Sequence, residues 1–189
     1  MEENKNITGI ILAGGQSSRM GADKGFVIYK GKTFIEHIIE AIKNLVDEII
    51  IISNHKNYDQ FELKRYEDLI KDAGPLAGIY TGLHYSKTEN NLIVSCDVPL
   101  ISDDILKKLI EQANSKFDVI QLNSNDKNMP LIAIYKKRCE AVFLEELNQE
   151  QRRVQKALDK CNVQTVVIDS FLEKQTTNIN TKKDLELLG

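Results

Sequence analysis

Short runs of apolar, often β-branched residues alternate along the chain with longer segments in which apolar residues recur at helical spacing. The four consecutive isoleucines at 49–52 have the length and composition of a parallel strand that is buried on both faces. The other runs also predict strands, because they are short, apolar and bounded by polar or glycine-containing segments. The predicted strands cover residues 7–13, 49–52, 92–96, 119–122, 131–135 and 163–168.

Segments with helical periodicity lie between these strands. Ser102 is expected to cap a helix whose first turn carries Asp103 and Asp104, where the helix dipole favours anions. Thr181 and Asp184 resemble a capping box and predict a last helix on Leu185, Leu187 and Leu188. The predicted helices lie at 35–46, around 58–63, at 76–83 and 103–110, within 138–148 and 150–160, and after 181.

The alternation of strands and helices predicts an α/β fold, a single domain over residues 1–189 with a mostly parallel twisted sheet and helices on both faces. In such folds ligands bind beyond the carboxyl ends of the strands. Three predicted strands end at candidate functional residues. The first is followed by Gly14-Gly15, the second by Ser53-Asn54 and the third by Asp97. These ends are therefore the expected site.

Composition excludes several classes of protein. With 189 residues, 42% hydrophobic and 28% charged, the chain is typical of a globular domain. A net charge of -3 gives no electrostatic reason to expect binding of nucleic acid. No window approaches the roughly 20 apolar residues that cross a bilayer, and the first six residues are polar, so we expect a cytoplasmic protein that does not bind membranes. Cys96, Cys139 and Cys161 are expected to be reduced thiols.

The loop after the first strand combines glycines with two cations. Its glycines, among them Gly14 and Gly15, allow the main chain to approach a ligand closely, and Arg19 and Lys24 supply positive charge for phosphate groups. The spacing fits neither a Walker A loop nor the dinucleotide fingerprint GxGxxG. An isolated pair of glycines is more often a flexible connection, in which the arginine and lysine would be merely solvated.

The loop as a whole resembles the signature loop of the nucleotidyltransferase superfamily, whose fold is Rossmann-like and GT-A-like. The matching string is LAGG, then four residues, Met-Gly, one residue and Asp-Lys. In particular, it resembles the loop of the molybdenum cofactor guanylyltransferases. The resemblance implies that Arg19 and Lys24 are catalytic and bind phosphates. It also implies that Asp97, in Asp-Val-Pro, is catalytic and holds Mg²⁺ with the triphosphate; by itself, such a segment is more often a turn. The residues it assigns to the nucleotide are Leu12, Ala13, Gly14, Gly15, Lys24, Asn54, Asp68, Gly74, Pro75 and Asp97.

The chain departs from the family pattern at two positions, and the same pattern suggests residues for the acceptor substrate. Ile52 stands where some relatives carry an asparagine, and Met129 stands where relatives often carry a histidine. The family pattern assigns the acceptor to residues 101–189, with nucleotide binding in residues 1–100. The acceptor candidates are Arg152, Arg153, Asn178 and Asn180. A solvated helix face explains the arginines equally well, and helix initiation is an adequate explanation of Asn180.

The implied reaction transfers GMP from GTP to the phosphate of molybdopterin, which would already carry molybdenum, and releases pyrophosphate. Molybdoenzymes or cofactor-biosynthesis proteins are the implied protein partners. Transfer from CTP, transfer to a sugar phosphate, and a non-catalytic module that binds GTP or delivers the cofactor are the alternatives. Gly14 favours GTP over CTP, because cytidylyl-transferring relatives tend to carry alanine at this position. The cations and Asp97 together favour turnover over binding alone.

Overall fold

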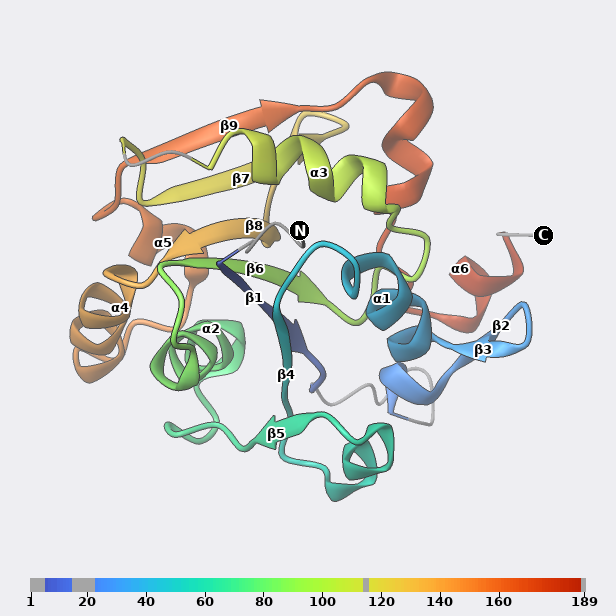
Figure 1. The fold of residues 1–189 in the computed structure, drawn as a ribbon, viewed down its shortest axis with the longest axis horizontal. Coiled ribbons are helices and arrows are strands. Elements are labelled where there is room, and N and C mark those ends of the chain that lie inside the picture. Colours follow the sequence, from blue (N-terminus) through green and yellow to red (C-terminus); the bar gives the residue numbers. More distant parts are fainter. Residues whose placement is uncertain (1–5, 15–22, 114–115, 188–189) are drawn as a thin grey trace.

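A central twisted sheet organises the computed structural model, which describes residues 6–14, 23–113 and 116–187 (Figure 1). Its strands lie in the order β5-β4-β1-β6-β8-β7-β9, and among the described residues β8 alone runs antiparallel to its neighbours. The sheet is therefore mostly parallel, as expected. The strands are β1 (Ile7–Leu12), β4 (Glu48–Ile52), β5 (Lys64–Tyr66), β6 (Asn90–Ser95), β7 (Val119–Ser124), β8 (Lys127–Lys136) and β9 (Val163–Val167).

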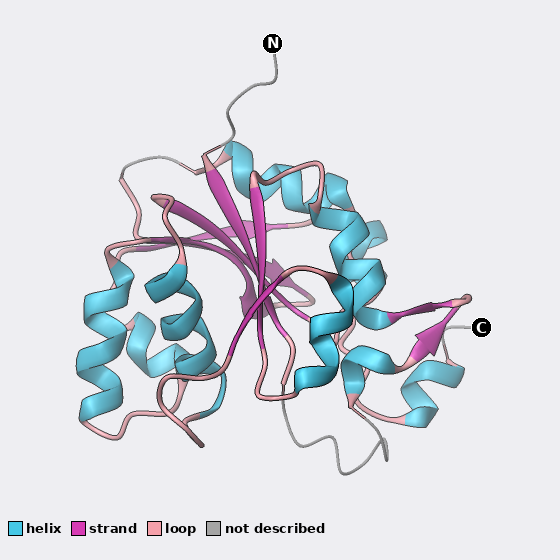
Figure 2. Ribbon diagram, turned by 60° about the horizontal axis from the view of Figure 1, so that its bottom comes forward, coloured by secondary structure: helices cyan, strands magenta, loops and turns pink. Residues whose placement is uncertain are grey.

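Helices cover both faces of the sheet (Figure 2). On one face lie α1 (Phe34–Ile42) and α3 (Asp103–Glu111), and on the other lie α2 (Gly74–Tyr85), α4 (Cys139–Asn148) and α5 (Val154–Leu158). Neighbouring residues of β1 point to opposite faces of the sheet. Ile11 therefore packs in the core under α1 and α3, and Ile10 packs in the core under α2, α4 and α5. Both isoleucines are fully buried. The expected fold class is thus confirmed.

Smaller elements complete the described fold. A hairpin of two short strands follows the first 3-10 helix, and the last helix lies at the same end of the molecule (Figure 1). These elements are η1 (Lys24–Phe26), β2 (Ile28–Tyr29), β3 (Lys32–Thr33), η2 (Lys56–Phe61), η3 (Ser170–Thr176) and α6 (Lys182–Glu186). No helix in the described part of the chain combines the length and apolarity that a membrane span requires.

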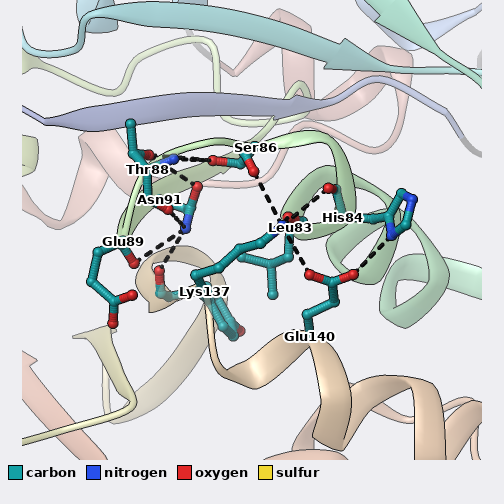
Figure 3. Close-up of polar contacts among 9 residues, drawn as sticks. Leu83, His84, Ser86, Thr88, Glu89, Asn91, Lys137 and Glu140 are labelled. Atoms are coloured by element: carbon teal, nitrogen blue, oxygen red, sulfur yellow. Dashed lines mark hydrogen bonds and ion pairs between the residues drawn. The ribbon is translucent and has the colours of Figure 1, made fainter.

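Helix α2 lies unusually close to β1. A Cβ atom at Gly82 would come within 2.5 Å of Ile10 Cγ2, so only glycine permits this approach. Lys137 Nζ holds the carboxyl end of the same helix by donating to the carbonyls of Leu83, of His84 at 3.0 Å and of Ser86 at 3.1 Å (Figure 3). The cation suits the negative end of the helix dipole. These contacts fix α2 so that its first turn, at Gly74, faces the carboxyl edge of the sheet.

Several predicted elements need correction. The helix predicted at 35–46 ends at Ile42, and Leu45 and Val46 are buried in the turn before β4. The helix predicted around 58–63 is the 3-10 helix η2. Ser102 stands at the start of α3, but its hydroxyl makes no capping bond and has no hydrogen-bond partner among the described residues. The Thr181 and Asp184 capping box is confirmed, with Asp184 N donating to Thr181 Oγ1 at 3.1 Å.

Candidate active site

A cavity of about 420 Å³ lies beyond the carboxyl ends of β1 and β4, beside the first turn of α2. It brings together seven of the residues assigned to the nucleotide, which come from four separate segments. Gly15 and Arg19 lie outside the described residues. The lining consists of Leu12, Ala13, Gly14, Ile52, Ser53, Asn54, His55, Asp68, Asp72, Gly74, Pro75, Gly78, Ser95 and Leu131. We refer to it as the first cavity.

Asn54 and Asp68 form a reciprocal pair in the wall of the first cavity. Asn54 Nδ2 donates to Asp68 Oδ2 at 2.9 Å, and Asp68 N donates to Asn54 Oδ1 at 3.0 Å. Lys71 Nζ also donates to Asn54 Oδ1, at 3.1 Å. Burial raises the pKa of Asp68 above its ordinary value, and the hydrogen bond from Asn54 opposes this rise. The pair thus presents a fixed carboxylate acceptor to the cavity.

A second cavity, of about 460 Å³, adjoins the first. The hairpin of β7 and β8 forms much of its wall, together with η3 and the residues that follow it. Ser95 and Leu131 line both cavities, so the two spaces meet at the end of β6. The lining consists of Ser95, Asp97, Val98, Ser124, Asn125, Lys127, Asn128, Met129, Pro130, Leu131, Ile132, Glu173, Thr176, Thr177 and Asn178.

Asp97 and Lys24 lie next to the junction of the cavities. Asp97 Oδ1 accepts from Ser95 Oγ at 2.6 Å, and Asp97 Oδ2 lies 3.7 Å from Lys24 Nζ. Both side chains are largely shielded, with 15% of Asp97 and 22% of Lys24 exposed. Lys24 Nζ also donates to Asn180 Oδ1, and the Asp97 carbonyl accepts from Ile179 N at 2.8 Å. Ile179 and Asn180 therefore pack against Asp97 and Lys24, respectively.

The oxygen donors at Asp97 suit Mg²⁺ that is shared with a substrate. Among the residues described, no three His, Cys, Asp or Glu side chains gather into a metal-binding group. A cage made wholly of protein ligands is thus not present in that part of the chain. Mg²⁺ commonly binds one or two carboxylates, several waters and substrate phosphates, which needs no such cage. A single shielded carboxylate in the second cavity, next to its junction with the first, fits this mode.

The paired arginines lie away from both cavity linings. Arg152 and Arg153 precede α5 and are exposed, and Arg152 Nη1 donates to the Leu147 carbonyl at 3.1 Å. The Arg152 carbonyl lies 4.0 Å from the point where a Cβ of Gly74 would stand. The pair is therefore nearer to the first cavity than sequence order suggests. Asn178 lines the second cavity, and Asn180 contacts Lys24.

Sequence reasoning did not identify several residues of these walls. Ser95 orients Asp97 from two residues upstream, and its position at the end of a predicted strand was the available signal. Leu131 lines both cavities, although its apolar run indicates only a strand. Lys127, the first residue of β8, brings a cation to the second cavity, although the sequence around it indicates only a polar turn. Asp72 and Gly78 also line the first cavity; the segment 72–78 matches a family motif, but only Gly74 and Pro75 within it were assigned to the nucleotide.

Two adjoining cavities, with a carboxylate and an ammonium group beside their junction, are an arrangement suited to joining two anionic substrates on an α/β fold of the nucleotidyltransferase type. Residues 9–165 match the family model described as the MobA-like NTP transferase domain. This match covers well over half of the chain. The chain therefore belongs to the MobA-like NTP transferase family.

Individual relatives agree with this assignment. The chain is 39% identical over 185 residues to the "Probable molybdenum cofactor guanylyltransferase" of Flavobacterium johnsoniae, covering 98% of this chain and 97% of the relative. It is 35% identical over 184 residues to the protein of the same name from Bacillus cereus strain B4264, covering 93% and 92%. The "Molybdopterin-guanine dinucleotide biosynthesis protein A" structure from Archaeoglobus fulgidus superimposes with a TM-score of 0.80 at 23% identity, over 95% of each chain.

Proposed function

We propose that this protein transfers GMP from GTP to the phosphate of molybdopterin, with or without bound molybdenum, releasing pyrophosphate and forming the guanine dinucleotide cofactor. Two cavities meet at Ser95 and Leu131, beside Asp97 and Lys24, and this arrangement is the main support for the proposal. The names of the Flavobacterium and Bacillus relatives support the same reaction. A cytoplasmic location, and exchange of the product with molybdoenzymes or other cofactor-biosynthesis proteins, belong to this proposal.

GTP would occupy the first cavity. The Asp68 carboxylate, held by Asn54, can accept hydrogen bonds from the N1 and N2 donors of a guanine edge. Cytosine presents a single amino donor, so this acceptor favours guanine. Gly14, and Gly15 after it, would bring the main chain close to the nucleotide, with Gly74 and Pro75 on the opposite segment of the lining. Residues 1–100 would thus supply most of the nucleotide side.

The acceptor would occupy the second cavity, most of whose lining comes from residues 101–189. Met129, Pro130 and Leu131 offer an apolar surface to a ring system, whereas Lys127 and Asn178 offer polar partners. Asn180 would act beside them through its contact with Lys24. Arg152 and Arg153 remain acceptor candidates whose side chains would have to reach the substrate from outside this lining.

The chemistry requires alignment and neutralisation of charge. An oxygen of the acceptor phosphate attacks the α-phosphorus of GTP, the new P–O bond forms, and the bond to the bridging oxygen breaks as pyrophosphate leaves. Lys24, with Arg19, stabilises the negative charge that develops at the α-phosphate. Mg²⁺ bound by Asp97 and the triphosphate would supply further neutralisation. The acceptor phosphate is already ionised, so no general base is needed.

Product analysis tests this proposal. The protein is incubated with Mg²⁺, molybdopterin and labelled GTP or CTP, and the dinucleotide and pyrophosphate are identified. A guanine dinucleotide supports the proposal. A cytosine product, or transfer only to a sugar phosphate, would replace the substrates but keep the class of enzyme. GTP binding without pyrophosphate release would indicate the non-catalytic module.

Lys24→Ala in the same assay tests the role of the ammonium group. It should lower kcat more than it raises the GTP KM, because the charge it neutralises grows in the transition state. A change in KM alone would make Lys24 a ground-state binding residue.

A further inference from the structure

A buried tyrosine outside both cavities contacts the residue that precedes Lys24. Tyr58, from η2, donates its hydroxyl to Asp23 Oδ1 at 2.5 Å, and the same oxygen accepts from Gly25 N at 3.1 Å. Asp23 is the N-cap of η1, the short turn that carries Lys24. The hydroxyl of Tyr58 thus reaches the main chain on both sides of Lys24 through one carboxylate oxygen.

Packing gives Tyr58 little freedom to move. Its side chain is fully buried, and its ring centroid lies 4.7 Å from that of Phe26 and 6.2 Å from that of Phe61. A Cβ atom at Gly25 would lie 2.0 Å from the Tyr58 hydroxyl oxygen, so the tyrosine fills the space directly above η1. The aromatic group therefore fixes this turn from one side, while its hydroxyl fixes Asp23.

A role in the hydrophobic core alone explains the ring but not the hydroxyl. Phenylalanine would fill almost the same volume, and burying a hydroxyl is costly unless it finds a strong partner. A hydrogen bond to an ionised carboxylate is shorter and stronger than one between neutral groups. Burial first, and then the neighbouring Cys96 and Asp23, raise the pKa of Tyr58 far above its ordinary value, so the hydroxyl stays a donor.

We propose that Tyr58 is a positioning residue, whose hydroxyl holds η1 through Asp23 so that Lys24 Nζ stays beside Asp97. This inference rests on the catalytic role proposed for Lys24. Lys24 Nζ lies 3.7 Å from Asp97 Oδ2, and a small rotation of the turn would lengthen that separation. Misplacing a group that acts in the transition state reduces kcat more than substrate binding.

The test replaces only the hydroxyl. In the full chain, Tyr58→Phe should lower kcat about tenfold and change the GTP KM by less than about twofold. Phe61→Leu is the matched control, because it disturbs the same aromatic cluster without touching the hydroxyl. This control should lower the melting temperature while kcat stays within about twofold of the parent. A kcat for Tyr58→Phe equal to that of the parent would overturn the proposal.

A double-mutant cycle shows whether the hydroxyl acts through Lys24. In a Lys24→Ala background Tyr58→Phe should reduce the rate no further, because the group that it positions is already absent. An equal loss in both backgrounds would indicate general destabilisation and refute the positioning role. Asp23→Asn, which keeps an acceptor oxygen, should retain more activity than Asp23→Ala.

Hydrogen exchange separates this inference from the proposed function. The Gly25 amide should exchange faster in Tyr58→Phe than in the parent, while amides of β1 remain protected to the same degree. This measurement needs no substrate. Absence of guanylyl transfer in the parent would therefore refute the proposed function, whereas unchanged Gly25 exchange would refute the positioning contact by itself.

Discussion

Gly14→Ala is the perturbation that best separates the shape of the first cavity from the stability of the fold. A Cβ atom at Gly14 would meet no heavy atom of the described residues within 4 Å, and its φ lies outside the left-handed region. Alanine is therefore compatible with the local backbone. Since Gly14 lines the first cavity, the methyl group would occupy space that a nucleotide could use, and the melting temperature should stay unchanged.

The expected size of the effect follows from the value of one methyl group in a pocket. Such a group is worth roughly 1 to 3 kcal/mol, or about 10-fold to 200-fold in kcat/KM. The purine of GTP needs more room than the pyrimidine of CTP, so the variant should lose more with GTP. The parent should prefer GTP, and Gly14→Ala should narrow the difference without necessarily reversing it.

The assay measures kcat/KM for GTP and for CTP in the parent and in Gly14→Ala with the same molybdopterin preparation. A parent that prefers CTP would refute the guanylyl assignment. An unchanged ratio in the variant would move base selection to other residues, such as Asp68, whose carboxylate also lines the first cavity. A large fall in melting temperature would contradict the open space at Gly14.

Three further predictions concern charge. Asp97→Asn should lower the rate of pyrophosphate release by about a hundredfold or more, which is the usual effect of removing one electrostatic group from an active site. Its melting temperature should equal that of the parent. Turnover close to that of the parent would remove Asp97 from the mechanism. Lys137→Met should lower the free energy of unfolding by about 1 to 3 kcal/mol, because three carbonyls and the Glu140 carboxylate lose their shared donor. Denaturant titration measures this change. An unchanged unfolding midpoint would refute the stabilising role of Lys137. Although burial opposes the shift, hydrogen bonds from Lys137 and His84 lower the pKa of Glu140 below its ordinary value of 4.5. Its contribution is therefore present above pH 4.5 and lost as the pH falls through the lower folded pKa, so the melting temperature of Glu140→Gln should depend less on pH in this range.

The buried strands could be predicted because each carries its own signal. A parallel strand covered on both faces needs a nearly continuous apolar run, and every predicted run became a strand. The same reasoning explains why β5 was missed, since its sequence Lys-Arg-Tyr lies at the edge of the sheet and is only partly buried. The hairpin of β2 and β3 has two residues per strand, too few for any periodicity.

The clustering of most residues assigned to the nucleotide was also predictable, because these residues directly follow predicted strands or stand in a local motif. Leu12, Asn54 and Gly74 come from different segments, yet the parallel sheet brings all three to one cavity. Contacts between distant segments have no such signal. Lys24 meets Asn180 across 156 positions, and the Tyr58 contact with Asp23 spans 35. Each depends on how the whole chain folds, so no local pattern could indicate it.

The position of the paired arginines shows why order along the chain is a poor guide to the acceptor side. Strand β8 inserts antiparallel between β6 and β7, and the chain then returns as α4 and α5 to the face already covered by α2. Arg152 thereby comes next to Gly74, although 78 positions separate them and sequence order places the two in different halves. Replacing Arg152 and Arg153 together with alanine should raise the acceptor KM and spare the GTP KM if the side chains reach the second cavity. A rise in the GTP KM alone would instead assign the pair to the nucleotide.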